Sequence, residues 1–89
     1  MRKFKTTRQF DRDFKRMIRS GKEKDKLIEI MQKLIAEQPL DAKHRDHKLR
    51  GRFEARRECH IEPNWLLIYK LEDDCVIFER TGSHSDLFR

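Results

Sequence analysis

The chain has 89 residues, of which 43% are charged and 36% hydrophobic, and its net charge is +6. Residues 1–89 are therefore expected to form one small domain, and no apolar run approaches the roughly 18 residues that a transmembrane helix needs, which excludes such a helix. The basic N-terminus, MRKFKTTRQF, lacks the apolar region of a signal peptide, so we expect a cytoplasmic protein with Cys59 and Cys75 as free thiols.

The N-terminal half has the pattern of a short strand followed by two helices. KFKT at 3–6 is typical of a strand, and Thr7 is a suitable N-cap for the first helix. Apolar residues at helical spacing form the buried stripe of this helix: Phe10, Phe14, Met17 and Ile18. The second helix follows the polar segment 20–25 and has the apolar stripe Leu27, Ile28, Met31, Leu34 and Ile35. Pro39 ends it, because the residue before a proline avoids helical conformation.

A basic segment separates these helices from the C-terminal half. Residues 41–51 are predicted to be a loop or a single helical turn, and from Arg52 the apolar period becomes two, as in a strand. One face of this strand, which we expect to be buried, carries Phe53, Ala55, Arg57, Cys59 and Ile61. The other face, which we expect to be exposed, carries Arg52, Glu54, Arg56, Glu58, His60 and Glu62.

Two further strands complete the predicted fold. Pro63 and Asn64 make a turn, and the run from 65 to 71 is apolar on both faces, which predicts a central strand. A third strand at 75–81 ends at Gly82, and a short tail follows. The order β-α-α-β-β-β predicts an α+β fold, in which an antiparallel sheet packs against the N-terminal helical hairpin.

Histidines are the first candidates for chemistry, because they exchange protons near neutral pH. His47 lies in the basic segment, His60 near the end of the first long strand, and His84 three residues beyond the third strand. Convergence of these three on one cleft and a scatter over the surface are both consistent with the pattern. His44 and His47 with Asp46 also form a possible metal site, although two histidines in a loop are a weak signal.

Three other side chains near the ends of strands have two possible roles each. Arg80 either pairs with Glu79 or Glu62 in a salt bridge or binds a phosphate, whose oxygens suit its planar guanidinium. Trp65 and Phe88 are either core residues or platforms on which a base stacks.

The positive charge lies in two blocks. Residues 1–22 contain nine Lys and Arg against two Asp, and residues 43–57 contain seven Lys and Arg against two acidic residues. Such blocks favour a polyanionic partner, and RNA, DNA or an acidic protein would each satisfy them. The basic residues that we consider for this contact are Arg8, Arg12, Lys15, Arg16, Lys48, Arg50, Arg52 and Arg56.

Three segments between residues 45 and 88 carry a family resemblance. DHKLRG, RECHIEPNWLLIYKL and FERTGSHSDLF occur in this order. They resemble the hallmark segments of the RelE superfamily of bacterial toxins, above all its YafQ branch. The branch patterns run close to D-H-x-L-x-G, R-[DE]-x-H-[VIL]-x-P-D-W-[IL]-L-[IV]-Y and R-x-G-[ST]-H-x-x-L-F. The N-terminal half agrees only in its strand-helix-helix plan.

The resemblance implies the toxin of a type II toxin–antitoxin pair. Such a toxin is a small endoribonuclease that enters the ribosomal A site and cleaves mRNA without a metal or other cofactor. The resemblance also implies an antitoxin partner, contact with ribosomal RNA, and binding of operator DNA only through the antitoxin complex. It assigns His47, His60, Arg80 and His84 to catalysis and Asn64, Trp65 and Phe88 to substrate binding.

One of these positions departs from the family pattern, which commonly has aspartate where this chain has Asn64. Asparagine keeps the hydrogen-bonding shape but cannot accept a proton as a carboxylate does. If that aspartate is a general base, this chain is a weakened enzyme or a module that only binds RNA and antitoxin. If it orients a histidine or a nucleotide, asparagine suffices. An RNase that acts without ribosomes is a further alternative.

Overall fold

The computed structural model describes residues 1–51 and 55–88 of the chain. Three residues of the predicted first long strand, Arg52, Phe53 and Glu54, lie outside the described residues. The elements in chain order are β1 (Lys3–Thr6), α1 (Arg8–Arg19), α2 (Lys24–Ile35), the 3-10 turn η1 (Ala42–His44), β2 (His47–Lys48), β3 (Arg57–Glu62), β4 (Trp65–Glu72), β5 (Cys75–Gly82) and α3 (His84–Leu87). The predicted α+β fold and its β-α-α-β-β-β order are confirmed, with the short elements η1, β2 and α3 added to them.

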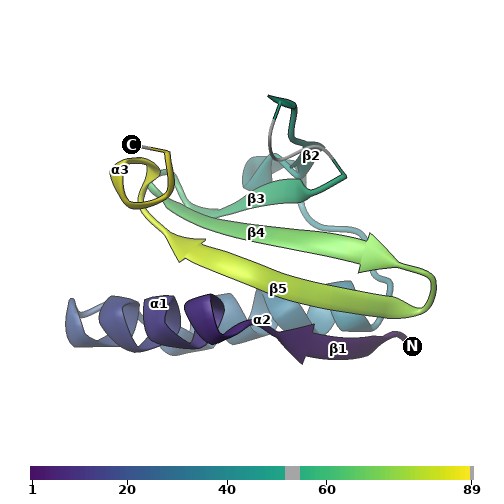
Figure 1. Ribbon diagram of the computed structural model, residues 1–89, viewed down its shortest axis with the longest axis horizontal. Helices are drawn as coiled ribbons and strands as arrows, with labels where there is room; N and C mark the ends of the chain where they lie inside the picture. The colour runs from purple at the N-terminus through teal and green to yellow at the C-terminus, as the bar shows by residue number, and fades with distance from the viewer. Residues whose placement is uncertain (52–54, 89) are drawn as a thin grey trace.

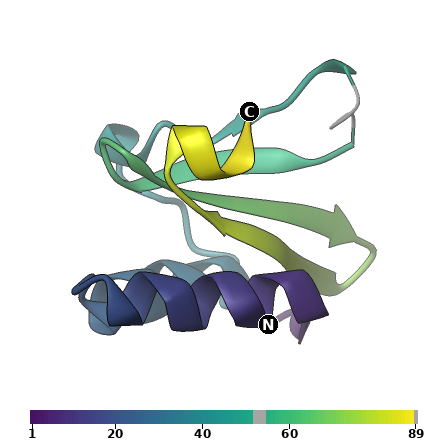
Figure 2. The same ribbon diagram turned by 60° about the vertical axis from the view of Figure 1, so that its left-hand side comes forward.

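The strands form one five-stranded sheet in the order β1-β5-β4-β3-β2. β3, β4 and β5 are antiparallel neighbours and β4 is central, as predicted. β1 pairs with β5 in parallel, with Lys3 opposite Cys75 and Thr6 opposite Phe78, so the whole sheet is mixed. Figure 1 shows α1 and α2 under one face of the sheet and α3 above the other. The turned view of Figure 2 shows the same layers.

Alternation along β4 explains why its sequence is apolar on both faces. Trp65, Leu67 and Tyr69 belong to the main core, which lies between the sheet and the two long helices. Leu66 and Ile68 belong to a second, smaller core on the opposite face, where Leu87 of α3 and the partly buried Leu49 pack against them. Within the described residues no helix is long and apolar enough to cross a bilayer.

Thr7 fixes where α1 begins and where it lies. Its hydroxyl oxygen accepts a hydrogen bond from the Phe10 amide at 3.0 Å, as expected for an N-cap, and donates one to the Glu79 carbonyl at 2.8 Å. The Thr7 amide donates to the Phe78 carbonyl at 3.1 Å. β1 stops pairing with β5 at Phe78, and beyond this point Asp13 of α1 accepts a hydrogen bond from the Thr81 amide on β5.

The first long strand differs from the prediction in two ways. β3 begins at Arg57, and Ala55, which was predicted to lie within the strand, has a left-handed backbone with φ of 72°, which interrupts an extended chain. The face that carries Glu58 and His60 was predicted to be exposed, and this is wrong: their side chains are only 5% and 9% exposed. The second core and the segments beside it cover this face.

The end of β5 also differs from the prediction. Gly82 is the last residue of the strand and not a break in it. A Cβ atom at Gly82 would lie 3.0 Å from the Asp86 Cβ atom, so a larger residue would crowd α3. Ser83 caps α3 by accepting a hydrogen bond from the Asp86 amide, while the Asp86 carboxylate accepts one from the Ser83 amide. The predicted tail is therefore an ordered helical turn.

Candidate active site

Cross-strand register places the candidate residues on the face opposite the long helices. Glu58, Ile68 and Arg80 form one row across β3, β4 and β5, and His60, Leu66 and Gly82 form the next. Cross-strand partners project from the same face of a sheet. Glu58, His60 and Arg80 therefore surround Leu66 and Ile68, which are the floor of the site. Gly82 leads directly into α3 and its His84.

The structure brings together His47, His60 and His84. The ring centroids of His47 and His60 are 6.4 Å apart, and those of His60 and His84 are 5.8 Å apart. The ring of Phe88 follows, 6.4 Å from that of His84. Residues from β2, β3 and α3 thus form one continuous cluster, although 37 positions separate its first and last histidines in the sequence.

Each of these histidines uses its Nδ1 atom in the same way. Nδ1 faces the Arg45 carbonyl at 2.6 Å in His47, the Pro63 carbonyl at 3.3 Å in His60, and the Asn64 side-chain oxygen at 3.0 Å in His84. All three partners are acceptors, so Nδ1 carries the proton and donates. In a neutral ring Nε2 is then the free acceptor, and in a protonated ring it is a donor. Both states suit general acid–base chemistry.

Glu58 is the carboxylate of this cluster. Its Oε1 atom lies 3.5 Å from Nε2 of His47 and 3.5 Å from Nε2 of His60. The Glu58 side chain is buried between the two rings, within reach of a proton on either Nε2 atom. Sequence reasoning placed Glu58 on the correct face but assigned it no role. Its spacing of two from His60 on a strand was the available signal.

Asn64 contacts His84 twice. Its side-chain oxygen accepts hydrogen bonds from the His84 backbone amide and from Nδ1, both at 3.0 Å. A backbone amide can only donate, so this contact also fixes which end of the Asn64 side chain faces His84. The side chain holds the first turn of α3 and orients the imidazole. Neither task needs a carboxylate.

Arg80 has a partner that sequence reasoning did not anticipate. Its guanidinium donates to Asp13 of α1, from Nε at 2.7 Å and from Nη2 at 3.2 Å. Neither acidic residue that we predicted as a partner is used: Glu79 pairs with Arg56, and Glu62 pairs with Lys22 and Lys26. The side chain of Arg80 remains 29% exposed despite this contact.

Trp65 requires a correction, and Phe88 does not. Trp65 is fully buried in the main core, and its indole N–H donates to the Thr81 hydroxyl at 2.9 Å. It therefore has no free ring face for a base, and the predicted stacking role is wrong for this residue. Phe88 is 38% exposed beside His84, so its ring is accessible to a base.

The segment that carries His47 is anchored to the core. The buried Tyr69 hydroxyl donates to Asp46, and Arg57 contacts both of these side chains. Burial raises the pKa of Tyr69, and its bond to Asp46 raises it further, so the hydroxyl keeps its proton and remains a donor. Burial likewise raises the pKa of Cys59, whose side chain lies in the main core on the opposite face of the sheet, and this disfavours a nucleophilic thiolate there.

His44, Asp46 and His47, which the sequence offered as a weak metal site, contact other protein groups in the structure. The His44 ring donates to the His60 carbonyl at 2.6 Å, and Asp46 is occupied by Tyr69 and Arg57. Among residues 1–51 and 55–88 no group of three or more His, Cys, Asp or Glu side chains is arranged to hold a metal ion.

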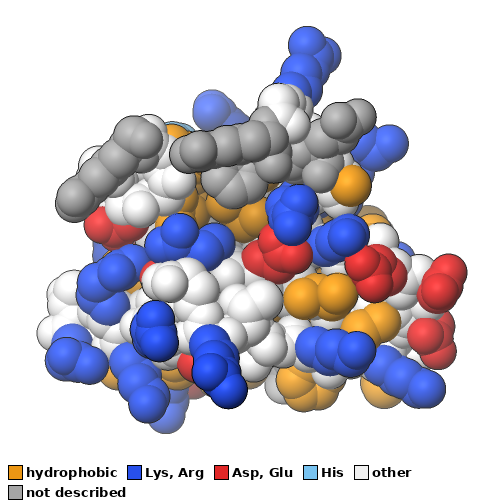
Figure 3. Space-filling view, viewed as in Figure 1, with side chains coloured by type: hydrophobic (Ala, Val, Ile, Leu, Met, Phe, Trp, Pro, Cys, Tyr) orange, Lys and Arg blue, Asp and Glu red, His pale blue; other side chains and the backbone are white. Residues whose placement is uncertain are grey.

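The basic candidates occupy two regions. Arg8, Arg12, Lys15 and Arg16 are exposed on α1, and Figure 3 shows Lys and Arg side chains gathered over this helix. Lys48 and Arg50 are also exposed, whereas Arg52 lies outside the described residues. Arg56 is only partly exposed and pairs with Glu79, so it is the least suited of the set to contact an external phosphate.

Comparison with known proteins gives a consistent result. A model of the family described as bacterial toxin of type II toxin-antitoxin system, YafQ, matches residues 2–89. The mRNA interferase toxin YafQ of Escherichia coli K12 is 43% identical over 81 residues, which cover 90% of this chain and 88% of that protein. The crystal structure of YafQ from E. coli BL21(DE3) is 39% identical, with a TM-score of 0.95 over 100% of both chains. YafQ in the crystal structure of the E. coli DinJ-YafQ complex is 40% identical, with a TM-score of 0.93 over 100% of both chains.

Proposed function

Since the chain belongs to the YafQ family of type II toxins, we propose that it is a cytoplasmic endoribonuclease that cleaves mRNA in the ribosomal A site. The observation that carries this proposal is the cluster of His47, His60 and His84, each with its Nδ1 atom fixed by an acceptor, on the face of the sheet that register also assigns to Arg80. RNA supplies its own nucleophile, the 2′-hydroxyl. Cleavage then requires a base, an acid and a positive group for the phosphate, and these residues provide all three.

In the proposed reaction the 2′-oxygen attacks the adjacent phosphorus and the bond to the 5′-oxygen breaks. One histidine Nε2 takes the 2′-hydroxyl proton, and a protonated Nε2 on another histidine donates a proton to the leaving 5′-oxygen. The products are a 2′,3′-cyclic phosphate and a free 5′-hydroxyl. We assign the acid to His60, because Glu58 lies 3.5 Å from its Nε2 and balances its positive charge. His84 contacts a neutral amide and is assigned the base.

The other residues hold the substrate in this scheme. Arg80 stabilises charge on the phosphorane oxygens, and His47 helps to orient the phosphate or exchanges protons. Phe88 stacks on a base next to the scissile bond. Asn64 keeps His84 in place, and its amide is sufficient for this role, which favours an active enzyme over a module that only binds.

The partners follow from the charge and from the family. The exposed basic residues of α1 and of the segment around Lys48 contact ribosomal RNA, mostly through phosphates. An antitoxin, acidic in the part that covers the toxin, neutralises the protein, as DinJ is found with YafQ in the complex of the E. coli proteins. Operator DNA is bound only by the complex of toxin and antitoxin.

Primer extension on a reporter mRNA tests this proposal. The reaction is run with and without ribosomes, and each arm is repeated with EDTA. Cuts that need ribosomes and persist in EDTA are expected. Cuts in the absence of ribosomes would instead identify a free RNase, and loss of cutting in EDTA with otherwise intact ribosomes would contradict metal-independent chemistry. No cuts, restored by Asn64→Asp, would show that asparagine has weakened the enzyme.

A further inference from the structure

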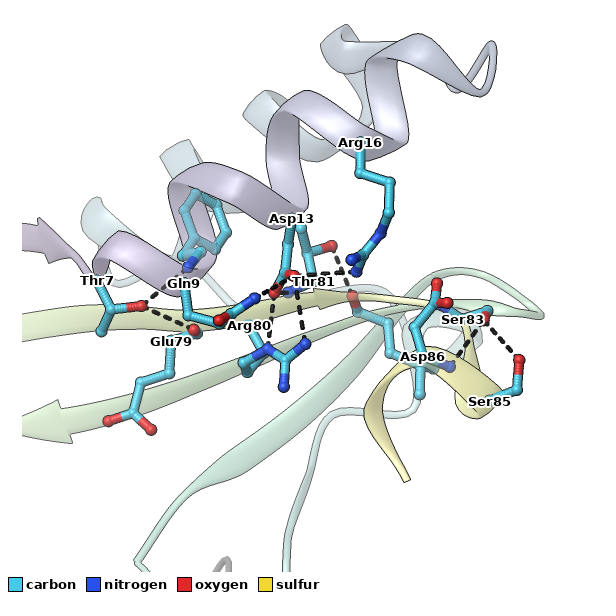
Figure 4. Close-up of polar contacts among 12 residues, drawn as sticks. Thr7, Gln9, Asp13, Arg16, Glu79, Arg80, Thr81, Ser83, Ser85 and Asp86 are labelled. Atoms are coloured by element: carbon cyan, nitrogen blue, oxygen red, sulfur yellow. Dashed lines mark hydrogen bonds and ion pairs between the residues drawn. The ribbon is translucent and has the colours of Figure 1, made fainter. Parts of the chain in front are cut away.

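Asp13 is the most completely satisfied charged side chain near the candidate site. It lies on α1, is 0% exposed, and accepts hydrogen bonds from four different residues (Figure 4). Arg80 donates two of them, as described above. The others come from the Thr81 amide at 3.2 Å, the Gln9 side chain at 3.0 Å and the Arg16 guanidinium at 3.0 Å.

A buried carboxylate in this position carries a free-energy cost, so its presence needs an explanation. Removing a charge from water carries a large desolvation cost, which hydrogen bonds and an opposite charge only offset. The Thr81 amide donates to Asp13 beyond the point where β1 stops pairing with β5, and a neutral acceptor at position 13 would satisfy it equally well. The feature that needs a carboxylate is the bidentate contact with Arg80, in which one carboxylate oxygen accepts from Nε and the other accepts from Nη2.

The orientation of Arg80 depends on this contact. An arginine side chain is long and flexible, and a free guanidinium on an exposed strand end samples many positions. Holding Nε and Nη2 on Asp13 fixes the plane of the guanidinium, and its remaining N–H groups then point in defined directions. Arg16, one turn further along α1, donates to the same carboxylate and so helps to hold the Asp13 side chain in place.

We propose that Asp13 is a positioning residue for RNA cleavage, which holds the guanidinium of Arg80 where the scissile phosphate binds. This inference rests on the role of Arg80 in the proposed function. It adds α1, which contributes no residue to the histidine cluster, to the parts of the fold on which catalysis depends. A displacement of about 1 Å in a catalytic group can lower a rate by about 100-fold.

A double-mutant cycle on single-turnover cleavage of ribosome-bound mRNA tests the proposal. The variants are Asp13→Asn, Arg80→Ala and the two combined, each at saturating toxin concentration. Asp13→Asn should lower the rate constant by about 10- to 100-fold, with little change in the concentration that gives half saturation. In the Arg80→Ala background, Asp13→Asn should change the rate constant by less than about twofold.

Gln9→Ala is the matched control, because it removes another donor to Asp13 and leaves Arg80 in place. It should retain the rate of the wild type. Circular dichroism measures the folded fraction of each variant. Asp13→Glu, which keeps the charge and displaces the carboxylate by one methylene, replaces Asp13→Asn in the cycle if the latter does not fold.

The outcomes separate this inference from the proposed function. Equal losses from Asp13→Asn in both backgrounds would show a merely structural role and overturn the inference. A wild-type rate for Asp13→Asn alongside a slow Arg80→Ala would overturn it too, while the role of Arg80 would stand. A wild-type rate for Arg80→Ala would instead contradict the proposed role of Arg80, and the inference would fall with it.

Discussion

At the scale of single residues, the shared use of Nδ1 is the feature that suits the histidines to their proposed acid–base roles. Carbonyl oxygens of Arg45 and Pro63 and the amide oxygen of Asn64 fix one ring nitrogen of each histidine. Each neutral imidazole is therefore held in one tautomer, with its proton on Nδ1, and the reaction does not have to supply free energy to select that tautomer. An acid or base prepared in this way lowers the barrier only if its Nε2 meets the reacting oxygen.

The substitution His84→Ala tests that condition. General acid–base residues contribute about 10²- to 10⁴-fold each, so we expect cleavage of ribosome-bound mRNA to slow by about this factor. The melting temperature should change little, because His84 is exposed. An unchanged rate would remove His84 from the mechanism.

The substitution Asn64→Asp tests the role of the amide. Aspartate can accept the same two hydrogen bonds, so the position of His84 should be retained. Its negative charge stabilises the protonated imidazole, and we therefore expect the limb of the pH–rate profile that reports the base to move to higher pH. Rates between pH 5 and pH 9 measure the shift. Asn64→Ala is the control, and it should lower the rate at every pH because the ring is no longer held.

The sequence indicates the candidate residues more directly than it indicates their surroundings. His47, His60 and His84 were selected by residue type and by motif. Asp13 was not selected, because on α1 it resembles any charged residue of a solvated helix and its partner Arg80 lies 67 positions away. The burial of Trp65 likewise depends on the packing of α1 and α2 against the sheet, which no local pattern in the sequence records.

At the scale of elements, the junction between β1 and α1 determines how the helix meets the sheet. The Thr7 hydroxyl caps α1 and also binds the Glu79 carbonyl, so one side chain sets both the start of the helix and its distance from β5. We expect Thr7→Val to lower the free energy of unfolding by about 1 kcal/mol, which is typical for the loss of an N-cap. Urea denaturation measures this change.

Thr6→Val is the matched control for this prediction. Thr6 is the neighbouring threonine in β1, it is exposed, and it does not cap the helix. Surface substitutions of this kind usually change stability by less than about 0.5 kcal/mol. Equal effects of the two substitutions would contradict the dual role of Thr7.

Periodicity in the sequence predicts which segments are helices and which are strands, but it does not predict which strands pair. The helical stripes of α1 and α2 and the apolar run of β4 are local signals, and they were read correctly. The parallel pairing of Lys3 with Cys75 joins residues that are far apart in the chain, and a strand of four residues carries no signal that specifies its partner. The exposed face predicted for β3 was wrong because α3, read as a tail, folds over the same side of the sheet.

At the scale of the whole molecule, ion pairs connect the two layers. Glu62 lies at the end of β3 and contacts Lys22, between the helices, and Lys26 of α2. Hydrogen bonds from Lys26 and then Lys22 hold the pKa of Glu62 below its usual value. A lowered pKa in the folded state stabilises the protein above the pKa of the unfolded state, and this contribution is lost as the pH falls through the folded pKa.

The substitution Glu62→Gln is therefore expected to have an effect that depends on pH. At pH 7 it should lower the free energy of unfolding, by at most about 1 kcal/mol because the pairs are near the surface. The difference from the wild type should shrink below about pH 4, and it should also shrink in 1 M salt. Urea denaturation at several pH values measures it. A difference that grows in acid would contradict the assignment.

The uneven charge distribution predicts the salt dependence of the proposed contact with ribosomes. Basic side chains gather over α1, whereas acidic residues 72–74 gather at the turn between β4 and β5 (Figure 3). Affinity for ribosomes should fall as salt rises, and the double substitution Arg8→Ala with Arg12→Ala should reduce the slope of log affinity against log salt by about 1 to 2. Lys24→Ala with Lys33→Ala on α2 is the control and should leave the slope unchanged.

The parallel pairing of β1 with β5 also sets the order in which the molecule can be completed during its own synthesis. The ribosome makes β1 and α1 first, yet the partner of Lys3 is Cys75 and the partners of Asp13 are Arg80 and Thr81. A nascent chain that ends before Cys75 lacks the partner of β1, and one that ends before His84 lacks the last histidine of the cluster. Neither the complete sheet nor the full histidine cluster can therefore form until the last part of the chain has been made.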